Sequence, residues 1–474
     1  MESASKRTKT GGGAEVNYRI LALYRFVPLA APEEAEASLA LSNIRTELLE
    51  ALRRHDVKGT LLIAPEGING TISYPWSASD TDSAASSSDL CQSPSTNDDD
   101  DPVHTYLGTH PLFGGPELRT RISQWTSSSP PFHRLKVKIK SEIVTLGLGR
   151  PMVQRIPRYD PNERVECNRL ADPNSTKGTY LSPAEWDDVC RDPDILVIDT
   201  RNRYEIDIGT FESSVDPGTE NFSDFPSYLE KLAGEYDWGY NSEAVTDSRA
   251  NPSDGQSAVP CKKKPPKGIA MFCTGGIRCE KATSFALQSE LLPSELPIYH
   301  LEGGILAYLD DVAKRKKCSV NSPKDSEDGQ EGSSEDRKEN SSTFHGECFV
   351  FDKRVAVTEG LRPSSIYSSC HGCRGPIERR LLDPSTRCTT GMSRESMERH
   401  DALVISLEQS GLGKPPPLCH DKKSGRSYIP GLTCPRCHDC TNRESLEKFA
   451  MRKLQVELCG RDGRSHFEDR AAAT

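Results

Sequence analysis

A short glycine-rich loop between a strand and a helix constrains this chain more than any other segment. The apolar run Gly268–Phe272 predicts a buried strand, the loop Cys273–Arg278 follows it, and a helix is predicted from Cys279. A strand, a tight loop and a helix start direct backbone N–H groups and the positive end of a helix dipole at one point. We therefore expect the Cys273 thiol to have a pKa below the ~8.5 of free cysteine and to act as a nucleophile.

The other loop residues have predicted roles of their own. Arg278 closes the loop and would add a fixed positive charge that supports the thiolate or an anionic substrate. The remaining loop residues would supply a cradle of N–H groups: Thr274, Gly275, Gly276 and Ile277. Phosphatases with a cysteine nucleophile have a longer loop between the cysteine and the arginine. The loop of this chain is therefore narrower than the loop that binds a phosphate group. The alternative is an ordinary glycine turn with a passive buried cysteine.

The loop resembles that of the rhodanese sulfurtransferases, whose cysteine carries a persulfide. Two further segments resemble the same family in the same order: Asp199–Phe211, with Arg201 and Glu205, and His300–Ile305. Thr210 stands where the family usually has histidine. The resemblance implies a rhodanese domain over residues 178–317 with a polar insertion at 241–266.

The same span predicts its fold without the resemblance. Strands alternate with helical patterns, and Ser182 with Glu185 forms a capping box before the helix that ends near Cys190. This alternation predicts an α/β fold with a parallel sheet flanked by helices. Such sheets place their sites at the carboxyl ends of the strands, where the Cys273 loop would lie.

The full amino-acid sequence of the loop and of the first helical turn points to a narrower family. Cys273–Ala282 resembles the tRNA wobble-uridine 5-hydroxylase family, a branch of the rhodaneses. Three other segments resemble that family: Ala64–Gly70, Arg134–Lys140 and Cys348–Arg354. The resemblance therefore covers most of the chain outside its polar segments.

Residues 17–150 predict a ferredoxin-like α+β domain. The expected elements follow the order β-α-β-β-α-β: strands at 19–27, 60–64, 70–74 and 135–139, helices at 32–55 and 116–125, and a turn at 67–70. Nothing in this domain suggests chemistry. It would either bind and orient RNA or cap the rhodanese domain.

Polar segments interrupt the chain and dominate its charge. Residues 1–16, 77–103, 241–266 and 318–343 have too little apolar surface to offset chain entropy, so we expect disorder there. Ser77–Val103 and Asn321–Thr343 together carry a net charge of −11, whereas the whole chain carries −10. The residues outside these two segments have a net charge close to zero, so the negative net charge of the whole chain does not exclude a nucleic-acid partner. Basic runs such as Arg134–Lys140 could contact phosphates or simply be solvated.

The cysteines point to metal or thiol chemistry. The N-terminus lacks an apolar signal region and no segment reaches membrane-spanning length, so we expect a cytoplasmic protein with no membrane contact. Sixteen cysteines in a reducing compartment favour metal ligation or free thiols over disulfides.

A Cys-rich module is predicted over residues 344–460. Two Cys-x2-Cys pairs can complete a tetrahedral structural Zn²⁺ site of the zinc-ribbon type: Cys370, Cys373, Cys434 and Cys437. The alternative ligands are Cys388, Cys419, His420, His438 and Cys440. A set of reduced, partly buried thiols is the other interpretation.

Three functions are compatible with these observations. The resemblance implies a tRNA-modifying enzyme that hydroxylates C5 of the wobble uridine with O₂, depends on Cys273 and contacts the anticodon region. The second is a persulfide sulfurtransferase that uses a small sulfur donor, with Cys279 as a possible resolving thiol. The third is a non-enzymatic scaffold. No flavin- or nucleotide-binding motif is present, and the sequence sets no oligomeric state.

Overall fold

The computed structural model describes residues 15–30, 34–76, 101–148, 152–155, 164–167, 171–238, 263–320, 342–383, 385, 388, 390–409, 411 and 414–462. The chain forms two compact units. The first comprises Met1–Asp352 with Thr358–Leu361, and the second comprises Lys353–Val357 with Arg362–Thr474. Most of the four segments predicted to be disordered lie outside the described residues.

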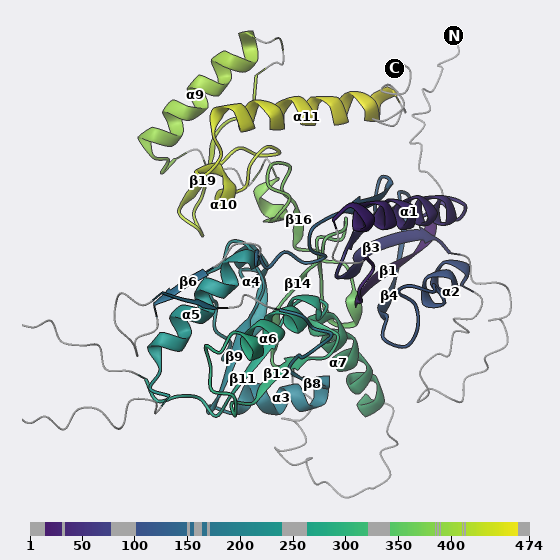
Figure 1. Cartoon of the computed structure of the whole chain (residues 1–474). Helices are drawn as coiled ribbons and strands as arrows, with labels where there is room; N and C mark the ends of the chain where they lie inside the picture. The colour runs from purple at the N-terminus through teal and green to yellow at the C-terminus, as the bar shows by residue number, and fades with distance from the viewer. Residues whose placement is uncertain are drawn as a thin grey trace, which may run out of the picture. The chain divides into compact units, whose positions relative to one another are not determined.

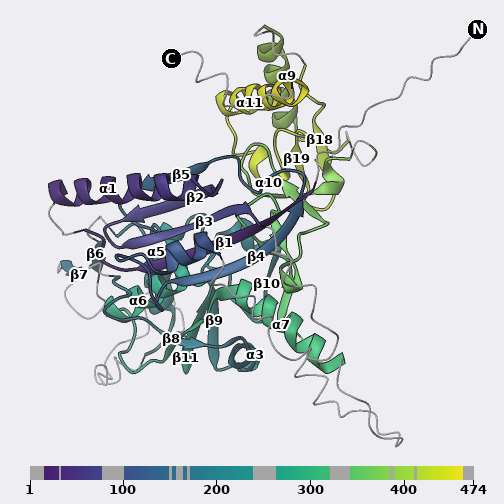
Figure 2. The same ribbon diagram turned by 90° about the vertical axis from the view of Figure 1, so that its right-hand side faces the viewer.

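The first unit opens with a five-stranded sheet (Figures 1 and 2). Its strands are β1 (Val16–Phe26), β2 (Lys58–Ala64), β3 (Gly67–Pro75), β4 (Arg119–Ser127) and β5 (Leu135–Ile139). They lie in the order β4-β1-β3-β2-β5, and β5 runs parallel to β2 whereas the other pairs are antiparallel. The helices are α1 (Glu34–Arg53) and α2 (Pro102–Gly108). The predicted β-α-β-β-α-β order is therefore present from β1 to β4, and β5 is added at the edge.

Three of the predicted elements in this sheet were wrong. The segment 116–125 is not a helix but belongs mainly to strand β4, whose Thr, Ile and Trp residues favour a strand. The second helix is α2, which begins inside the segment 77–103 that was predicted to be disordered. The residues 67–70 are not a turn but the first part of β3, and the turn is at Pro65 and Glu66.

A buried acid explains why α2 forms there. Asp101 is fully buried and accepts hydrogen bonds from the backbone N–H groups of Val103 and His104, both at 3.0 Å. It also accepts a hydrogen bond from Arg19 at 2.7 Å. Because Asp101 caps the helix and neutralises a buried guanidinium, the last residue of the Asp98–Asp101 run belongs to the folded core.

The second sheet of this unit is parallel, as predicted. Its strands are β8 (Thr179–Leu181), β9 (Ile195–Asp199), β11 (Gly268–Phe272) and β12 (Ile298–Leu301), in the order β8-β12-β11-β9. The main helices are α3 (Pro183–Arg191), α5 (Phe225–Glu235), α6 (Ile277–Gln288) and α7 (Gly304–Val320). The predicted capping box of Ser182 and Glu185 starts α3. The predicted α/β fold with a parallel sheet is confirmed.

Shorter elements complete the unit. They are α4 (Arg203–Ile206), β10 (Gly209–Phe211), β13 (Phe344–Gly346) and β14 (Cys348–Phe349), with the hairpin β6 (Met152–Arg155) and β7 (Arg164–Cys167). Strand β10 pairs antiparallel with β13, so the chain after the parallel sheet returns to it. Leu146, which follows the first sheet, packs into the core between α5 and α6.

The second unit is built from short elements. It contains β15 (Ala356–Val357), two hairpins, β16 (Tyr367–Ser369) with β17 (Pro376–Glu378) and β18 (Cys419–Asp421) with β19 (Arg426–Tyr428), and the helices α9 (Arg394–Gln409), α10 (Pro435–His438) and α11 (Arg443–Asp462). One of its small cores includes five cysteines, four buried and one partly buried. Within the described part of the chain, no helix has the length and apolar character needed to cross a membrane.

Candidate active site

The predicted loop lies at the carboxyl end of β11, next to the start of α6. The Gly276 N–H donates a hydrogen bond to Cys273 Sγ at 3.1 Å. Gly276 has φ 98°, and a Cβ atom there would lie 2.9 Å from the Tyr24 hydroxyl. Glycine is therefore required both for the conformation and for the close approach of the first sheet.

The start of α7 holds the other side of the loop. Ile305 N–H donates to the Cys273 carbonyl at 2.9 Å, and Leu306 N–H donates to the Thr274 carbonyl at 3.1 Å. Gly304 has φ 64°, and a Cβ atom there would lie 2.6 Å from the Cys273 carbonyl oxygen. The segment His300–Ile305 thus fixes the loop backbone from a second strand of the sheet.

The surroundings of Cys273 favour its thiolate. Its side chain is fully buried, and burial alone would raise the thiol pKa. The Cys279 thiol, the Arg278 charge and the N–H groups of Cys279 and Gly276 outweigh that cost and lower the pKa of Cys273 to about 6. By contrast, burial raises the pKa of Cys190 and of Cys348 to about 12. Cys273 differs from these buried cysteines because donors surround it.

Cys279 lies beside Cys273 and acts as a donor to it. Burial, followed by its hydrogen bond to Cys273, raises the pKa of Cys279 well above its ordinary value, so it remains a thiol. Its sulfur also lies 3.7 Å from the Thr200 hydroxyl. The two neighbouring thiols are free cysteines and form no disulfide in this structure.

Arg278 is committed to a buried carboxylate. Its two terminal nitrogens donate to the two oxygens of Glu205, both at 2.7 Å. Thr274 also donates to Glu205, at 3.2 Å. Arg278 therefore fixes the loop and supports the thiolate through its charge, but the geometry does not present it as a free group for an anionic substrate.

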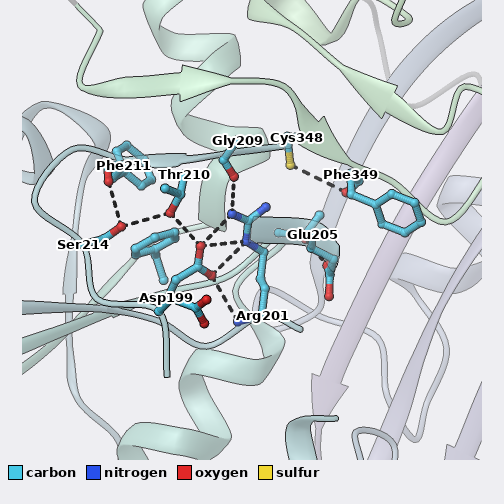
Figure 3. Close-up of polar contacts among 12 residues, drawn as sticks. Asp199, Arg201, Glu205, Gly209, Thr210, Phe211, Ser214, Cys348 and Phe349 are labelled. Atoms are coloured by element: carbon cyan, nitrogen blue, oxygen red, sulfur yellow. Dashed lines mark hydrogen bonds and ion pairs between the residues drawn. The ribbon is translucent and has the colours of Figure 1, made fainter. Parts of the chain in front are cut away.

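A second ion pair braces the segment around α4, the short helix that carries Glu205 (Figure 3). Arg201 Nη2 donates to Asp199 Oδ2 and to the Gly209 carbonyl, both at 2.6 Å. Thr210 stands where histidine was expected, and its hydroxyl donates to the same Asp199 oxygen at 2.8 Å. The hydroxyl group thus supplies a hydrogen bond to this carboxylate.

Two motifs that are far apart in sequence meet at α6. Lys281 is 1% exposed, and its ammonium group donates to Glu66 at 2.8 Å and to Glu142 at 2.6 Å. Glu66 belongs to the segment Ala64–Gly70, so this ion pair fastens the first sheet to the helix that follows Cys273. We expected no role for these three residues, although Lys281 and Glu66 lie within the quoted motifs.

A buried acid next to Lys281 accepts hydrogen bonds from two tyrosines. Glu280 is 3% exposed and accepts hydrogen bonds from the hydroxyls of Tyr24 and Tyr180, both at 2.7 Å. Lys177 lies 3.7 Å from its other oxygen. Sequence reasoning missed both tyrosines because nothing in their local sequence marks them, whereas Glu280 follows the loop directly.

In the second unit, the four predicted cysteines come together. The sulfurs of Cys370, Cys373, Cys434 and Cys437 all lie within 4.8 Å of one another. The separations Cys370–Cys437 and Cys373–Cys434 are 3.8 and 3.7 Å. A tetrahedral Zn²⁺ with Zn–S bonds of about 2.3 Å requires sulfur separations of about 3.8 Å. The alternative ligands, Cys388, Cys419, His420, His438 and Cys440, lie outside this cluster.

Together these features define an α/β protein with a buried cysteine in a loop at the carboxyl end of a parallel strand. Residues 18–143 match the family model described as the UPF0176 acylphosphatase like domain. A curated relative from Teredinibacter turnerae, tRNA uridine(34) hydroxylase, is 32% identical over 455 residues, which covers 96% of this chain and 94% of that protein. The chain belongs to the tRNA uridine(34) hydroxylase family.

One solved structure is also similar in sequence. It is a protein of unknown function from Rhodopseudomonas palustris, described as a possible tyrosine phosphatase. It is 23% identical and covers 33% of this chain and 93% of its own, with a TM-score of 0.18, which is too low to support a structural argument.

Proposed function

We propose that this chain hydroxylates C5 of the wobble uridine of tRNA and that Cys273 is its essential residue. The observation that carries the proposal is the setting of Cys273, a buried sulfur that accepts the Gly276 N–H at 3.1 Å beside Arg278 and the Cys279 thiol. These groups lower the pKa of Cys273 to about 6. The relative's name supplies the substrate, and its similarity extends over 96% of this chain. The parallel sheet with this loop would be a rhodanese-type domain.

The chain's own residues hold a thiolate ready at neutral pH. Because its pKa is lowered to about 6, the thiolate is the favoured form of Cys273 at pH 7. Hydroxylation replaces the C5–H bond by C5–OH, which is a two-electron oxidation of the uracil ring. We propose O₂ as the oxidant. One oxygen atom enters the ring, and a two-electron donor of the thiol class reduces the other to water.

The less buried residues of the loop indicate from which side the uridine can reach Cys273. Cys273 is fully buried, whereas Gly275 and Ile277 are half-buried. A nucleotide in a tRNA loop can be splayed out of its stack and inserted into a protein. We propose that uridine 34 enters beside Gly275 and that the loop opens locally to expose the sulfur.

The test is the appearance of the modified nucleoside in cells. The chain is expressed in a bacterial strain whose own wobble-uridine hydroxylation is disabled, and digested tRNA is analysed by mass spectrometry. We expect 5-hydroxyuridine with the wild-type chain and with Cys440→Ser, an exposed cysteine outside the metal cluster, but none with Cys273→Ser. Absence of 5-hydroxyuridine with soluble wild-type protein would refute the proposal.

Sulfur transfer is the second candidate, because the same cradle suits a persulfide anion on Cys273. Donated N–H groups stabilise a terminal sulfur as they do an oxyanion, and Cys279 lies beside it as a thiol. Attack of the Cys273 thiolate on the outer sulfur of thiosulfate would break the S–S bond, release sulfite and leave a persulfide on Cys273 that mass spectrometry detects. An unmodified Cys273 under these conditions would remove this candidate.

We also propose a structural Zn²⁺ in the second unit. Cys370, Cys373, Cys434 and Cys437 would hold it, since their sulfur separations fit a tetrahedron. The Arg436 guanidinium lies 3.3 Å from Cys373 Sγ and would offset part of the thiolate charge. Metal analysis by mass spectrometry should find about one zinc per chain, and purified folded protein without stoichiometric metal would contradict the proposal.

A further inference from the structure

The two faces of the first sheet have different neighbours. Leu21 and Leu61 point to one face, where they pack with apolar residues of α1. Because side chains alternate along a strand, their neighbours point to the opposite face. At one end of that opposite face, Tyr24 and Phe26 pack with Ile277 of the catalytic loop. This face therefore leads to the site of Cys273.

The strand register places basic residues at both edges of this face. One row across the sheet consists of paired residues from all five strands: Arg119, Tyr24, Asn69, Leu62 and Lys138. The next row consists of Arg121, Ala22, Thr71, Thr60 and Lys136. We call these two rows the basic face. Arginines stand on β4 and lysines stand on β5. Between them lie three short polar residues, Asn69, Thr71 and Thr60, together with Tyr24, Leu62 and Ala22.

The lysine edge carries charge that the described residues do not neutralise. Lys136 and Lys138 have no ion pair with a carboxylate in the part of the chain that the structure describes. Burial and the positive charges of Arg134 and Lys138 lower the pKa of Lys136. A row of like charges on neighbouring positions costs free energy, and an anionic partner removes that cost.

The arginine edge borders the catalytic loop. Arg119 donates to Glu302 at 3.1 Å, and its guanidinium lies 4.8 Å from the centre of the Tyr180 ring. A Cβ atom on Gly303, next to the glycine that packs on the Cys273 carbonyl, would lie 3.0 Å from Arg121 Nη2. The ion pairs of Arg119 with Glu302 and of Arg121 with Asp310 are partly exposed. Such pairs are weak, so a phosphate can compete for both arginines.

We propose that the basic face binds the sugar–phosphate backbone of the anticodon strand and leads it to Cys273. The inference rests on the proposed function and names the surface that holds its substrate. The face is about 19 Å wide from β4 to β5, at ~4.8 Å per strand, which accommodates several nucleotides of a single strand. Thr60 and Thr71 are half-buried in its middle, where their hydroxyls can bond to ribose and phosphate oxygens. Lys136 and Lys138 contact phosphates on one side of the wobble nucleotide, and Arg119 and Arg121 contact those next to it.

Binding of an anticodon stem–loop RNA, measured by fluorescence anisotropy at several salt concentrations, tests the inference. We expect the double variant Lys136→Gln/Lys138→Gln to raise Kd about tenfold and to lower the slope of log K against log salt by about 1.4. Arg121→Gln should raise Kd as well. The matched control is Arg53→Gln/Arg54→Gln, which removes the same charge from exposed positions at the end of α1.

Measurements of hydroxylation kinetics distinguish a failure of this binding inference from a failure of the proposed reaction. The double lysine variant should raise KM for tRNA about tenfold and leave kcat nearly unchanged, since it removes uniform binding. Lys136→Arg/Lys138→Arg keeps the charge and should restore both Kd and KM, which excludes a folding defect. Unchanged Kd and salt slope in the Gln variant would overturn the inference while hydroxylation stands. Tight RNA binding through this face without 5-hydroxyuridine would instead refute the proposed reaction.

Discussion

The charge state of Cys273 depends on donors that offset its burial. Because its pKa is lowered to about 6, the thiolate is present above pH 6 and is lost as the pH falls through that value. We predict a thiolate transition near pH 6 in the ultraviolet difference spectrum between the wild-type chain and Cys273→Ser. Hydroxylation should decline over the same pH interval.

The Cys279 thiol is one of those donors, so its removal should be visible in the same spectrum. Cys279→Ala should move the transition to higher pH and lower the activity at pH 6 to 7 more than at pH 8. Cys190→Ala, which removes another buried thiol on α3, should leave the transition in place. A transition unaffected by Cys279→Ala would show that the backbone N–H groups and Arg278 suffice.

At the scale of elements, helix α2 depends on a single buried carboxylate. Asp101→Ala removes the cap of α2 and leaves Arg19 buried without its partner, so we predict a loss of about 3 kcal/mol in the free energy of unfolding. Burial opposes ionisation of Asp101, but hydrogen bonds from Tyr74, His104 and Arg19 lower its pKa overall. The Asp101 carboxylate therefore contributes its full stabilisation above a pH of about 3.9, the pKa of an aspartate in the unfolded chain. This contribution is lost as the pH falls through the lower pKa that Asp101 has in the folded chain.

Urea unfolding of purified protein measures that loss. Asp56→Ala, which removes an exposed ion pair with Lys58, serves as the control and should cost less than about 1 kcal/mol. Equal costs for the two variants would mean that Asp101 is not part of the folded core.

The same helix illustrates why some elements could be predicted and others could not. The strand Gly268–Phe272 and the start of α3 follow from local patterns, an apolar run and a capping box, so their prediction succeeded. Helix α2 has a local start signal, the Asp101 cap followed by Pro102, but the acidic run around that signal predicted disorder. The contact that buries Asp101 joins it to Arg19, 82 residues away, and no local pattern shows that contact. Strand β4 lies at the sheet edge with alternating exposure, and its weak apolar pattern was mistaken for a helix.

The site divides along the same line. Cys273, Arg278 and the four-cysteine cluster were predicted from spacing within short segments. The partners Glu205, Glu66 and Tyr24 come from other elements, and the fold alone determines which acid meets which base. Sequence reasoning assigned Arg278 a charge but could not foresee that Glu205 neutralises it.

At the scale of the whole molecule, Lys281 couples the first sheet to α6, the helix that follows the Cys273 loop. Lys281→Met keeps the length of the side chain but leaves Glu66 and Glu142 facing each other without a cation. We predict that this variant loses at least tenfold in kcat/KM for tRNA, since the two parts no longer hold the substrate in register. Lys314→Met, at an exposed i,i+4 pair on α7, is the control. Wild-type kinetics for Lys281→Met would show that the ion pair serves stability alone.

The folding of the second unit should depend on the Zn²⁺ proposed for its four cysteines, whereas the folding of the first unit should not. Two small cores lie in the second unit: one consists of five cysteines with a few apolar residues, including Ile377 and Tyr428, and the other has six buried aliphatic residues. We infer that this apolar area is too small to hold the fold without a ligand. The first unit contains two larger cores of aliphatic and aromatic side chains. We therefore predict that a strong chelator unfolds residues 362–453 and leaves residues 171–238 folded.

Hydrogen exchange read by mass spectrometry distinguishes the two units in one experiment. Chelation should remove protection from β16 to β19 and from α9, and added Zn²⁺ should restore it. Cys370→Ser should reproduce the chelated pattern without a chelator, whereas Cys440→Ser should match the wild-type chain, because its sulfur lies outside the cluster. Protection in the second unit that persists in the chelator, with no bound zinc, would mean that the four thiols and their packing hold this unit by themselves.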